Sequence, residues 1–237
     1  MPPTQSLVRN RLLSLIDATA YAAVAPHLEA TKLPKGAVLI EAGVPFTHAH
    51  FFNSGIGSIV VGAIDSRSIE AGLFGREGMS GFACLLDVDQ CAQTTMVQVE
   101  GEGYRISIEA LRIACDQSPS LLKTIMRYVH VSLTQAYYTA LSNSTQPIEG
   151  RLARWLLMCH DRVSGDDLAL THEFLSIMLA VHRPSVTSAL HIIEGYGFIR
   201  ARRGNIAIID REALIAFANG MYGPPEAEYC RLIGPLS

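Results

Sequence analysis

The 237-residue chain has little of what marks membrane proteins, disulfide-rich domains or zinc ribbons. Charges or prolines interrupt every apolar run before it reaches the roughly 18 residues that a membrane span needs. The five cysteines are scattered, and no Cys-x-x-Cys pair occurs among them, which argues against a disulfide framework or a zinc site. Charged residues also interrupt the N-terminal stretch, so no secretory signal is predicted. We expect a cytoplasmic protein that does not contact membranes.

Charge and catalytic motifs are sparse as well. Charged residues make up 17% of the chain and hydrophobic residues 49%, a composition typical of a packed globular protein. The sequence contains no nucleophile elbow and no phosphate-binding P-loop, so neither an enzyme nor a cofactor is predicted. His48 and His50 would share one face of a strand, but two ligands are too few for a stable metal site. We expect them to be solvated residues at a sheet edge.

Glycine-punctuated strands are predicted to fill much of the first half of the chain. Residues 7–28 read as a helix that stops near Pro26. From about Leu33 to Ser107, short apolar runs such as AVLIEAG, AHFFNSG and TTMVQVEG alternate with glycine turns. That texture indicates an antiparallel sandwich, barrel or roll. Helices dominate from Ile108 on, so the fold class is α+β.

A long helix is predicted from Ser118-Pro119 to about Ser142. Apolar residues recur along it at spacings of four and three, which is the heptad pattern of paired helices. This seam could pack on the strand-rich domain or against a second chain. We favour a dimer helix, with Ile125 and Tyr137 turned toward the strands and a domain boundary near Pro147. The seam residues are Leu122, Met126, Val129, Leu133, Ala136 and Ala140.

The stretch LTHEFLSIMLAVHRPSVTSALHIIEGYGFIRARRG predicts two helices joined by a tight turn. Thr171 is a suitable N-cap for the first helix. Pro184 falls in the first turn of the second helix, where its missing N–H has no intrahelical partner to lose. Gly195 and Gly197 end that helix, and a hairpin with Gly204 at its tip follows. Helix, turn, helix and hairpin together predict a winged helix-turn-helix.

Such a domain can place the first turn of its second helix against base edges in the major groove. The wing arginines would neutralise phosphates. An arginine-dotted helical subdomain, or a winged helix that binds protein, would produce the same pattern. Four arginines against one glutamate between Arg183 and Arg203 favour DNA. The predicted DNA-contacting residues are Thr171, His172, Arg183, Pro184, Ser185, Thr187, Ser188, His191, Arg202 and Arg203.

Over nearly its full length the chain resembles the CRP/FNR superfamily of bacterial transcription regulators. The runs LPKGAVLIEAG, AHFFNSGIGSIVV and IEAGLFGREGMSGFACLL are similar to its cyclic-nucleotide-binding-type β-roll, a jelly-roll-like double-stranded β-helix. The resemblance implies a β-roll sensor at 1–117, a dimerisation helix at 118–144 and a winged helix-turn-helix at 145–237. It also implies a homodimer that binds a palindromic site in double-stranded DNA and contacts RNA polymerase.

Departures from the family pattern set further expectations. Arg183 matches an arginine that commonly reads guanine, whereas Pro184 and Ser188 stand where many members have glutamate and arginine. The DNA site should therefore differ from the best-known family sites. Ala180 stands where a turn glycine is usual, and a positive φ there would cost roughly 1 kcal/mol.

The ligand-binding pattern departs too. Cyclic-AMP-binding members place a glutamate after the Gly81-type glycine and an arginine about ten residues later. Here Phe82 follows Gly81, and no arginine lies between Arg76 and Arg105. A buried phosphate without its cation would be poorly compensated, so the usual binding of cyclic AMP is not expected. The effector stays unidentified, and a pocket for it would involve Gly81, Phe82, Cys84 and Ile125. A small-ligand module whose winged helix binds protein is the alternative function.

Overall fold

Two four-stranded antiparallel sheets form the body of the N-terminal half in the computed structural model, which describes residues 2–62 and 68–236. In spatial order, the first sheet contains β1 (Glu29–Leu33), β8 (Gly101–Ser107), β3 (His48–Phe52) and β6 (Met79–Ser80). The second contains β2 (Val38–Ile40), β7 (Thr94–Val99), β4 (Ile56–Gly62) and β5 (Ser68–Phe74).

The two sheets meet at a small core cluster. Leu33 and Phe52 from the first sheet pack with Phe74 and Val97 from the second. The rings of Phe52 and Phe74 meet edge to face with centroids 5.0 Å apart. Gly57 makes room for this packing, because a Cβ at that position would lie 2.4 Å from Cζ of Phe74. The predicted antiparallel roll is therefore confirmed.

The N-terminal segment corrects one expectation. Instead of one helix over residues 7–28, two short helices form, α1 (Arg11–Leu15) and α2 (Ala18–Val24). Asn10 caps the first by accepting a hydrogen bond from the Leu13 N–H, and Asp17 caps the second by accepting one from the Ala20 N–H. Each cap starts a new helix, which divides the predicted one.

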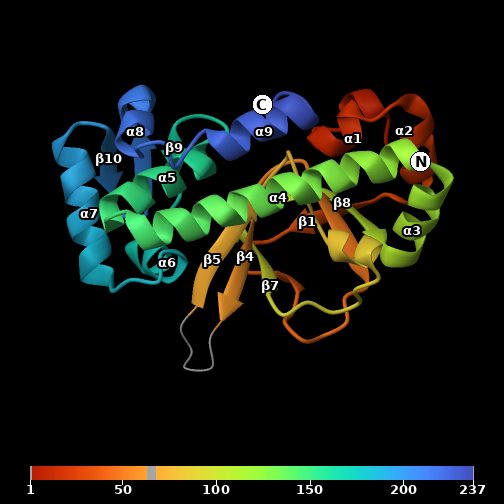
Figure 1. Ribbon diagram of the computed structural model, residues 1–237, viewed down its shortest axis with the longest axis horizontal. Helices are drawn as coiled ribbons and strands as arrows, with labels where there is room; N and C mark the ends of the chain where they lie inside the picture. The colour runs from red at the N-terminus through yellow and green to blue at the C-terminus, as the bar shows by residue number, and fades with distance from the viewer. Residues whose placement is uncertain (1, 63–67, 237) are drawn as a thin grey trace.

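A single long helix, α4 (Pro119–Thr145), crosses the whole molecule (Figure 1). It follows α3 (Ile108–Gln117), and Ser118 caps it by accepting a hydrogen bond from the Leu121 N–H. Tyr137 is 66% exposed, so the expectation that it turns toward the strands is wrong, because it lies outside the row that packs inward. The buried residues of α4 are Leu121, Ile125, Tyr128, Val131, Gln135 and Ser142.

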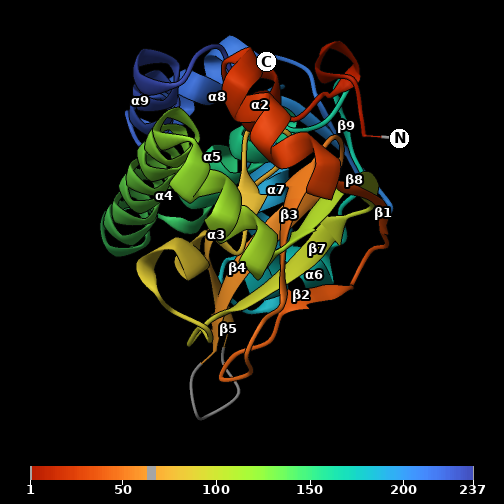
Figure 2. The same cartoon turned by 90° about the vertical axis from the view of Figure 1, so that its right-hand side faces the viewer.

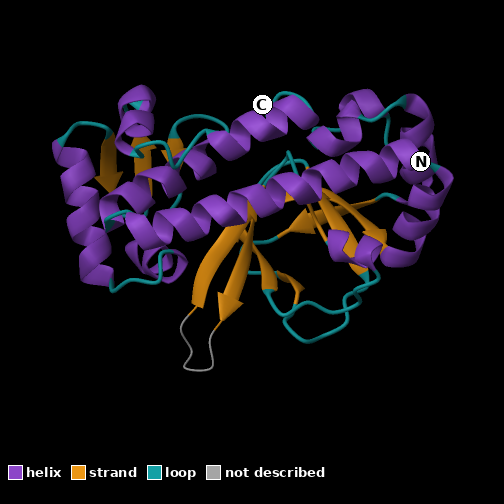
Figure 3. Cartoon of the chain, viewed as in Figure 1, coloured by secondary structure: helices purple, strands orange, loops and turns teal. Residues whose placement is uncertain are grey.

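The C-terminal half, residues 147–236, surrounds a small three-stranded sheet (Figure 3). Its helices are α5 (Ile148–His160), α6 (His172–Met178), α7 (Arg183–Gly195), α8 (Arg211–Phe217) and α9 (Pro224–Leu232). The strands are β10 (Ile199–Arg202), β11 (Asn205–Ile208) and β9 (Asp167–Leu168), in that spatial order. Together with the roll and α4, this arrangement confirms the α+β class with a winged helix-turn-helix at its C-terminal end.

Buried polar contacts join α5 to the roll. The Glu70 carboxylate, on β5, lies 2.6 Å from Ser58 Oγ and accepts a hydrogen bond from Trp155 Nε1 at 2.7 Å. Burial raises the pKa of Glu70 to about 7, although the hydrogen bonds from Ser58 and Trp155 act in the opposite direction. Nearby, Glu77 forms a fully buried ion pair with Arg162, with 2.8 Å between Oε1 and Nη2. These contacts hold the two halves in one arrangement.

Helix α9 fastens the end of the chain to α4 and the roll. Figure 2 shows α9 and α4 running side by side. The buried Tyr229 hydroxyl donates a hydrogen bond to the Glu77 carbonyl, and Arg127 of α4 donates one to the Leu232 carbonyl. No helix within residues 2–62 and 68–236 has the length and apolarity required to cross a membrane.

Candidate nucleic-acid interface

The second helix of the helix-turn-helix presents its first turn to solvent. Helix α7 begins at Arg183, and both Arg183 and Pro184 are exposed. Pro184 lies in the first turn, so its missing N–H removes no intrahelical hydrogen bond. Val186, Leu190 and Ile193 point inward and are fully buried. The inward row fixes how the helix rotates and leaves the Arg183 face outward.

The other predicted contact residues of α7 differ in how available they are. Ser188 and His191 are exposed, while Ser185 and Thr187 are half-buried. The Thr187 hydroxyl lies 3.0 Å from Nδ1 of His172 on α6, which ties the two helices together. Ser188 donates its hydroxyl proton to the Pro184 carbonyl at 3.2 Å, leaving its oxygen free to accept.

The hairpin after α7 forms a wing beside it. Arg202 of β10 pairs with Asn205 of β11, so Arg203 and Gly204 form a two-residue turn. Gly204 has a φ of 76°, a left-handed conformation that glycine adopts without steric cost. Arg202 and Arg203 are both exposed.

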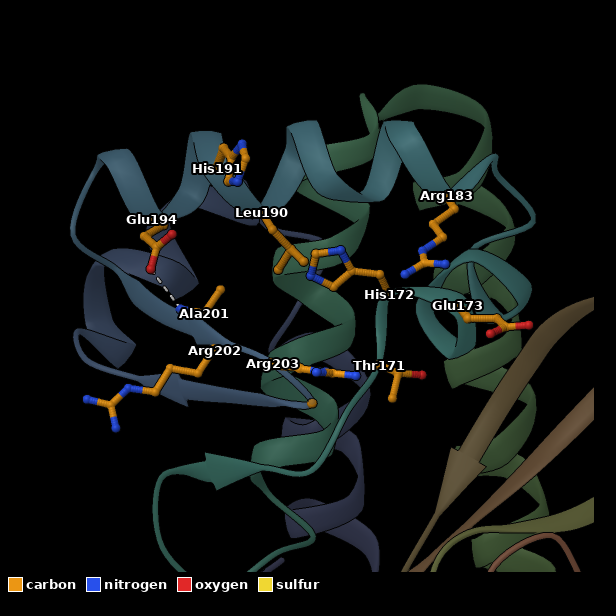
Figure 4. A pocket seen from close by; sticks show the side chains of 11 residues that line it. Thr171, His172, Glu173, Arg183, Leu190, His191, Glu194, Ala201, Arg202 and Arg203 are labelled. Atoms are coloured by element: carbon orange, nitrogen blue, oxygen red, sulfur yellow. Dashed lines mark hydrogen bonds between the residues drawn. The ribbon is translucent and has the colours of Figure 1, made fainter.

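A groove of about 770 Å³ separates α7 from the wing and the start of α6. Figure 4 shows Arg183 extending from α7 toward His172, and Arg202 and Arg203 also line the groove. Two carboxylates, Glu173 and Glu194, also line the groove. With three arginines against two glutamates, its walls carry a net positive charge, which favours a polyanion.

Two supporting residues have no signal in the local sequence. Arg151 of α5 donates a hydrogen bond from Nη2 to the Leu179 carbonyl in the turn and another from Nε to Asn143. Glu194 accepts a hydrogen bond from the Ala201 N–H at 2.8 Å, which fixes the wing to α7. Both contacts orient the helix and wing relative to each other. Only the folded structure brings these partners together.

The turn between α6 and α7 contains a strained residue. Ala180 has a φ of 51°, in the region where a Cβ costs about 1 to 2 kcal/mol. The Ala180→Gly change should therefore stabilise the protein by about 0.5 to 1 kcal/mol, after allowing for glycine's greater freedom in the unfolded chain. Chemical denaturation measures it. Ala140→Gly is the matched control: on the helix α4 it should destabilise by about 1 kcal/mol, and a loss of stability in both variants would contradict the strain.

The predicted seam residues of α4 occupy a face that the rest of the chain covers only partly. Leu122, Met126, Val129 and Ala136 are half-buried, and Ala140 is exposed. Leu133 is 48% exposed, although it is a large apolar residue. The hydrogen bonds between α9 and α4 involve Arg127 and His130, which lie outside the seam. Leu122 and Met126 pack partly against the neighbouring core cluster, whereas Leu133 and Ala140 remain exposed.

The four residues expected around an effector come together where the roll meets α4. Cys84 and Ile125 are each 1% exposed and share one packed cluster. The Phe82 ring meets Tyr128 of α4 edge to face, with centroids 6.0 Å apart. A Cβ on Gly81 would lie 2.9 Å from Ala49 Cα. This region is filled by side chains of the protein itself.

The two histidines of β3 differ in their position in the sheet. His50 pairs with Arg105 of β8 on one side and with Ser80 of β6 on the other, so the expectation of an edge residue is wrong for His50, whereas His48 pairs, among the described residues, only with Ser107 of β8. Burial, with smaller contributions from His48 and Arg105, lowers the pKa of His50 to about 4. Within the described ranges 2–62 and 68–236, no three His, Cys, Asp or Glu side chains gather as a metal site.

Known proteins share sequence similarity with this chain, most specifically over the helix-turn-helix. The model of the Crp-like helix-turn-helix domain matches residues 150–217. The chain is 22% identical to the CRP-like cAMP-activated global transcriptional regulator of Mycobacterium tuberculosis over 215 residues, which cover 88% of this chain and 96% of that protein.

Solved structures share the fold. A CRP-family transcriptional regulator from Thermus thermophilus superposes with a TM-score of 0.68 at 17% identity, covering 80% of this chain and 97% of the other. The c-di-GMP-responsive global regulator CLP of Xanthomonas campestris has a TM-score of 0.65 at 19% identity, covering 81% and 99%. These relatives are transcription regulators. The chain thus carries a match to the Crp-like helix-turn-helix domain at residues 150–217, and with its roll and long helix it shares the fold of CRP-family regulators.

Proposed function

We propose that this protein is a homodimeric transcription regulator that binds a palindromic site, its operator, in double-stranded DNA. The observation that carries the proposal is the exposed first turn of α7 with Arg183, beside a wing that bears Arg202 and Arg203. A major groove admits such a helix, and a guanidinium can donate two hydrogen bonds to one guanine. Arginines at the wing suit the phosphates on either side.

The proposed regulator has three functional segments, in order along the chain. Residues 1–117 form the sensor, 118–144 the dimerisation helix and 145–237 the DNA-binding domain, which in a dimer on DNA would stand beside RNA polymerase. The regulator is not expected to use cyclic AMP in the usual way, because Phe82 follows Gly81 and no arginine lies between Arg76 and Arg105. Any effector around Gly81, Phe82, Cys84 and Ile125 would have to displace side chains that pack there. Its binding would act by shifting the population of DNA-binding arrangements.

Two arginine variants test the proposed roles. An operator is first selected from random duplexes with the purified protein, and affinities are measured by fluorescence anisotropy at several salt concentrations. Arg183→Ala should weaken operator binding by about 1 to 3 kcal/mol and relax the preference at one base pair. Arg202→Ala should weaken all sequences alike and reduce the salt slope by about 1.

If both substitutions reduce the affinity equally for every operator variant, the result would contradict the base-reading role of Arg183. Failure of the selection to enrich any sequence, together with weak binding that does not depend on salt, would favour a winged helix that binds protein.

A further inference from the structure

Helix α1 lies at the end of the molecule opposite α7 (Figure 1), and residues of this helix line a second cationic pocket. Its volume is about 620 Å³, and its lining includes the side chains of Arg9, Arg11 and Arg76. Ser6, Ser14 and Val8 complete much of the wall, and no carboxylate lines it. Three guanidinium groups therefore face one space without an opposing charge in its lining.

The three arginines lack ion-pair partners in the part of the chain that the structure describes. Arg11 donates from Nε to the Pro235 carbonyl, a neutral acceptor, at 3.2 Å. Nε of Arg76 is buried and has no hydrogen-bond partner among the described residues. A buried donor left unpaired destabilises the protein, so an anion that accepts from it would gain from a donor that is already desolvated.

The backbone around the pocket is rigidly held. Asn10 is fully buried and donates hydrogen bonds to the Phe52 carbonyl at 2.9 Å and to the Gly78 carbonyl at 2.8 Å. The Arg11 N–H donates to the Arg76 carbonyl at 2.6 Å. These bonds fix the segment that carries Arg9 and Arg11 beside the segment that carries Arg76. The positions of the cations thus do not have to be assembled when a ligand arrives.

We propose that this pocket binds a small molecule through a phosphate or diphosphate group. Arginine forks match the oxygens of a phosphate bidentately, and several of them suit a dianion. The volume exceeds that of a bare phosphate and lies within the range of small-ligand pockets. No aromatic side chain lines it, so the phosphate and not a stacked ring provides the recognition.

The location connects the pocket to the C-terminal half. Arg76 is followed by Glu77, whose carboxylate pairs with Arg162 and whose carbonyl accepts from Tyr229 of α9. Arg11 holds the segment that follows α9 through Pro235. A bound phosphate would therefore contact the same two segments that fasten the end of the chain to the roll.

Isothermal titration calorimetry of the full-length protein without DNA tests the site, with inorganic pyrophosphate and ATP as probes at constant ionic strength. Both probes should bind saturably, and Arg9→Gln should weaken that binding at least about tenfold. Arg9 suits this test because it is exposed and its side chain makes no hydrogen bond recorded among the described residues, so the fold should persist. The Arg9→Gln, Arg76→Gln double variant should bind still more weakly.

Arg202→Gln, Arg203→Gln is the matched control, because it removes two exposed arginines from the other cationic groove. Its affinity for pyrophosphate should equal that of the unmodified protein. Loss of binding in this control instead of in Arg9→Gln would overturn the assignment. So would the absence of saturable binding of both probes at concentrations up to about 10 mM. Since no DNA is present, the result does not depend on the proposed regulatory function.

Discussion

Replacing Val129 and Leu133 together by glutamate is expected to separate the protein into monomers and to weaken operator binding about 100-fold or more. Val129 is half-buried and Leu133 is 48% exposed on the partly covered face of α4. If this face forms the proposed seam between two copies, placing carboxylates in it would cost several kcal/mol, because a buried unpaired charge loses its hydration. Linking two DNA-binding units raises affinity by about 10² to 10⁴, and a monomer forfeits that gain.

Sedimentation velocity and anisotropy on the same samples measure both effects. Ile113→Glu is the control, because Ile113 is an apolar residue of α3 with a similar exposure of 52% that lies away from the seam. It should leave mass and affinity unchanged. An intact dimer in the Val129, Leu133 variant would refute the seam as the dimer interface.

Glu77→Gln is expected to destabilise the protein by about 3 to 5 kcal/mol. It removes the carboxylate that pairs directly with the buried Arg162 and leaves only the more distant carboxylates of Asp161 and Glu226 to offset that charge. Both side chains of this pair are 3% exposed. Arg162 would keep its hydrogen bond to the Met158 carbonyl at 2.6 Å, but that acceptor is neutral. Urea denaturation at a fixed protein concentration gives the change in free energy of unfolding.

A second variant separates the lost charge pair from simple loss of packing. Replacing both partners with apolar residues, Glu77→Leu with Arg162→Met, removes the charges together and should cost clearly less than Glu77→Gln alone. Glu29→Gln, which breaks an exposed pair with Arg105, should change stability by less than about 1 kcal/mol. A double variant that is as unstable as the single one would mean that the ion pair is not the cause.

Local signals in the sequence predicted the parts of the fold that short-range chemistry determines. Ser118 and Pro119 marked the start of α4, and Pro184 marked the first turn of α7, because caps and proline act within one helical turn. Asn10 and Asp17 are cap residues too. Each of them marks the start of a separate helix, so these two residues predict α1 and α2 in place of one N-terminal helix.

Contacts between residues far apart in the chain could not be predicted from the sequence. Strand β9 has two residues and exists only because it pairs with Ile206 and Ala207 of β11. Glutamate is rarely buried without a partner, and Glu77 finds its partner in Arg162, far away in the chain. No residue near Glu77 in the sequence indicates this pairing. The phosphate pocket unites arginines from positions 9, 11 and 76, and neither spacing nor composition indicates that they meet.

The attachment of α9 makes the chain close on itself. The tail that ends the C-terminal half packs through Leu232, Ile233 and Leu236 into the cluster formed by the N-terminal helices and the roll. Proteolytic cleavage of the short link between α4 and α5 would therefore leave two fragments that stay associated under native conditions. The fragments would dissociate only when Tyr229, which is buried in the complete chain, becomes exposed.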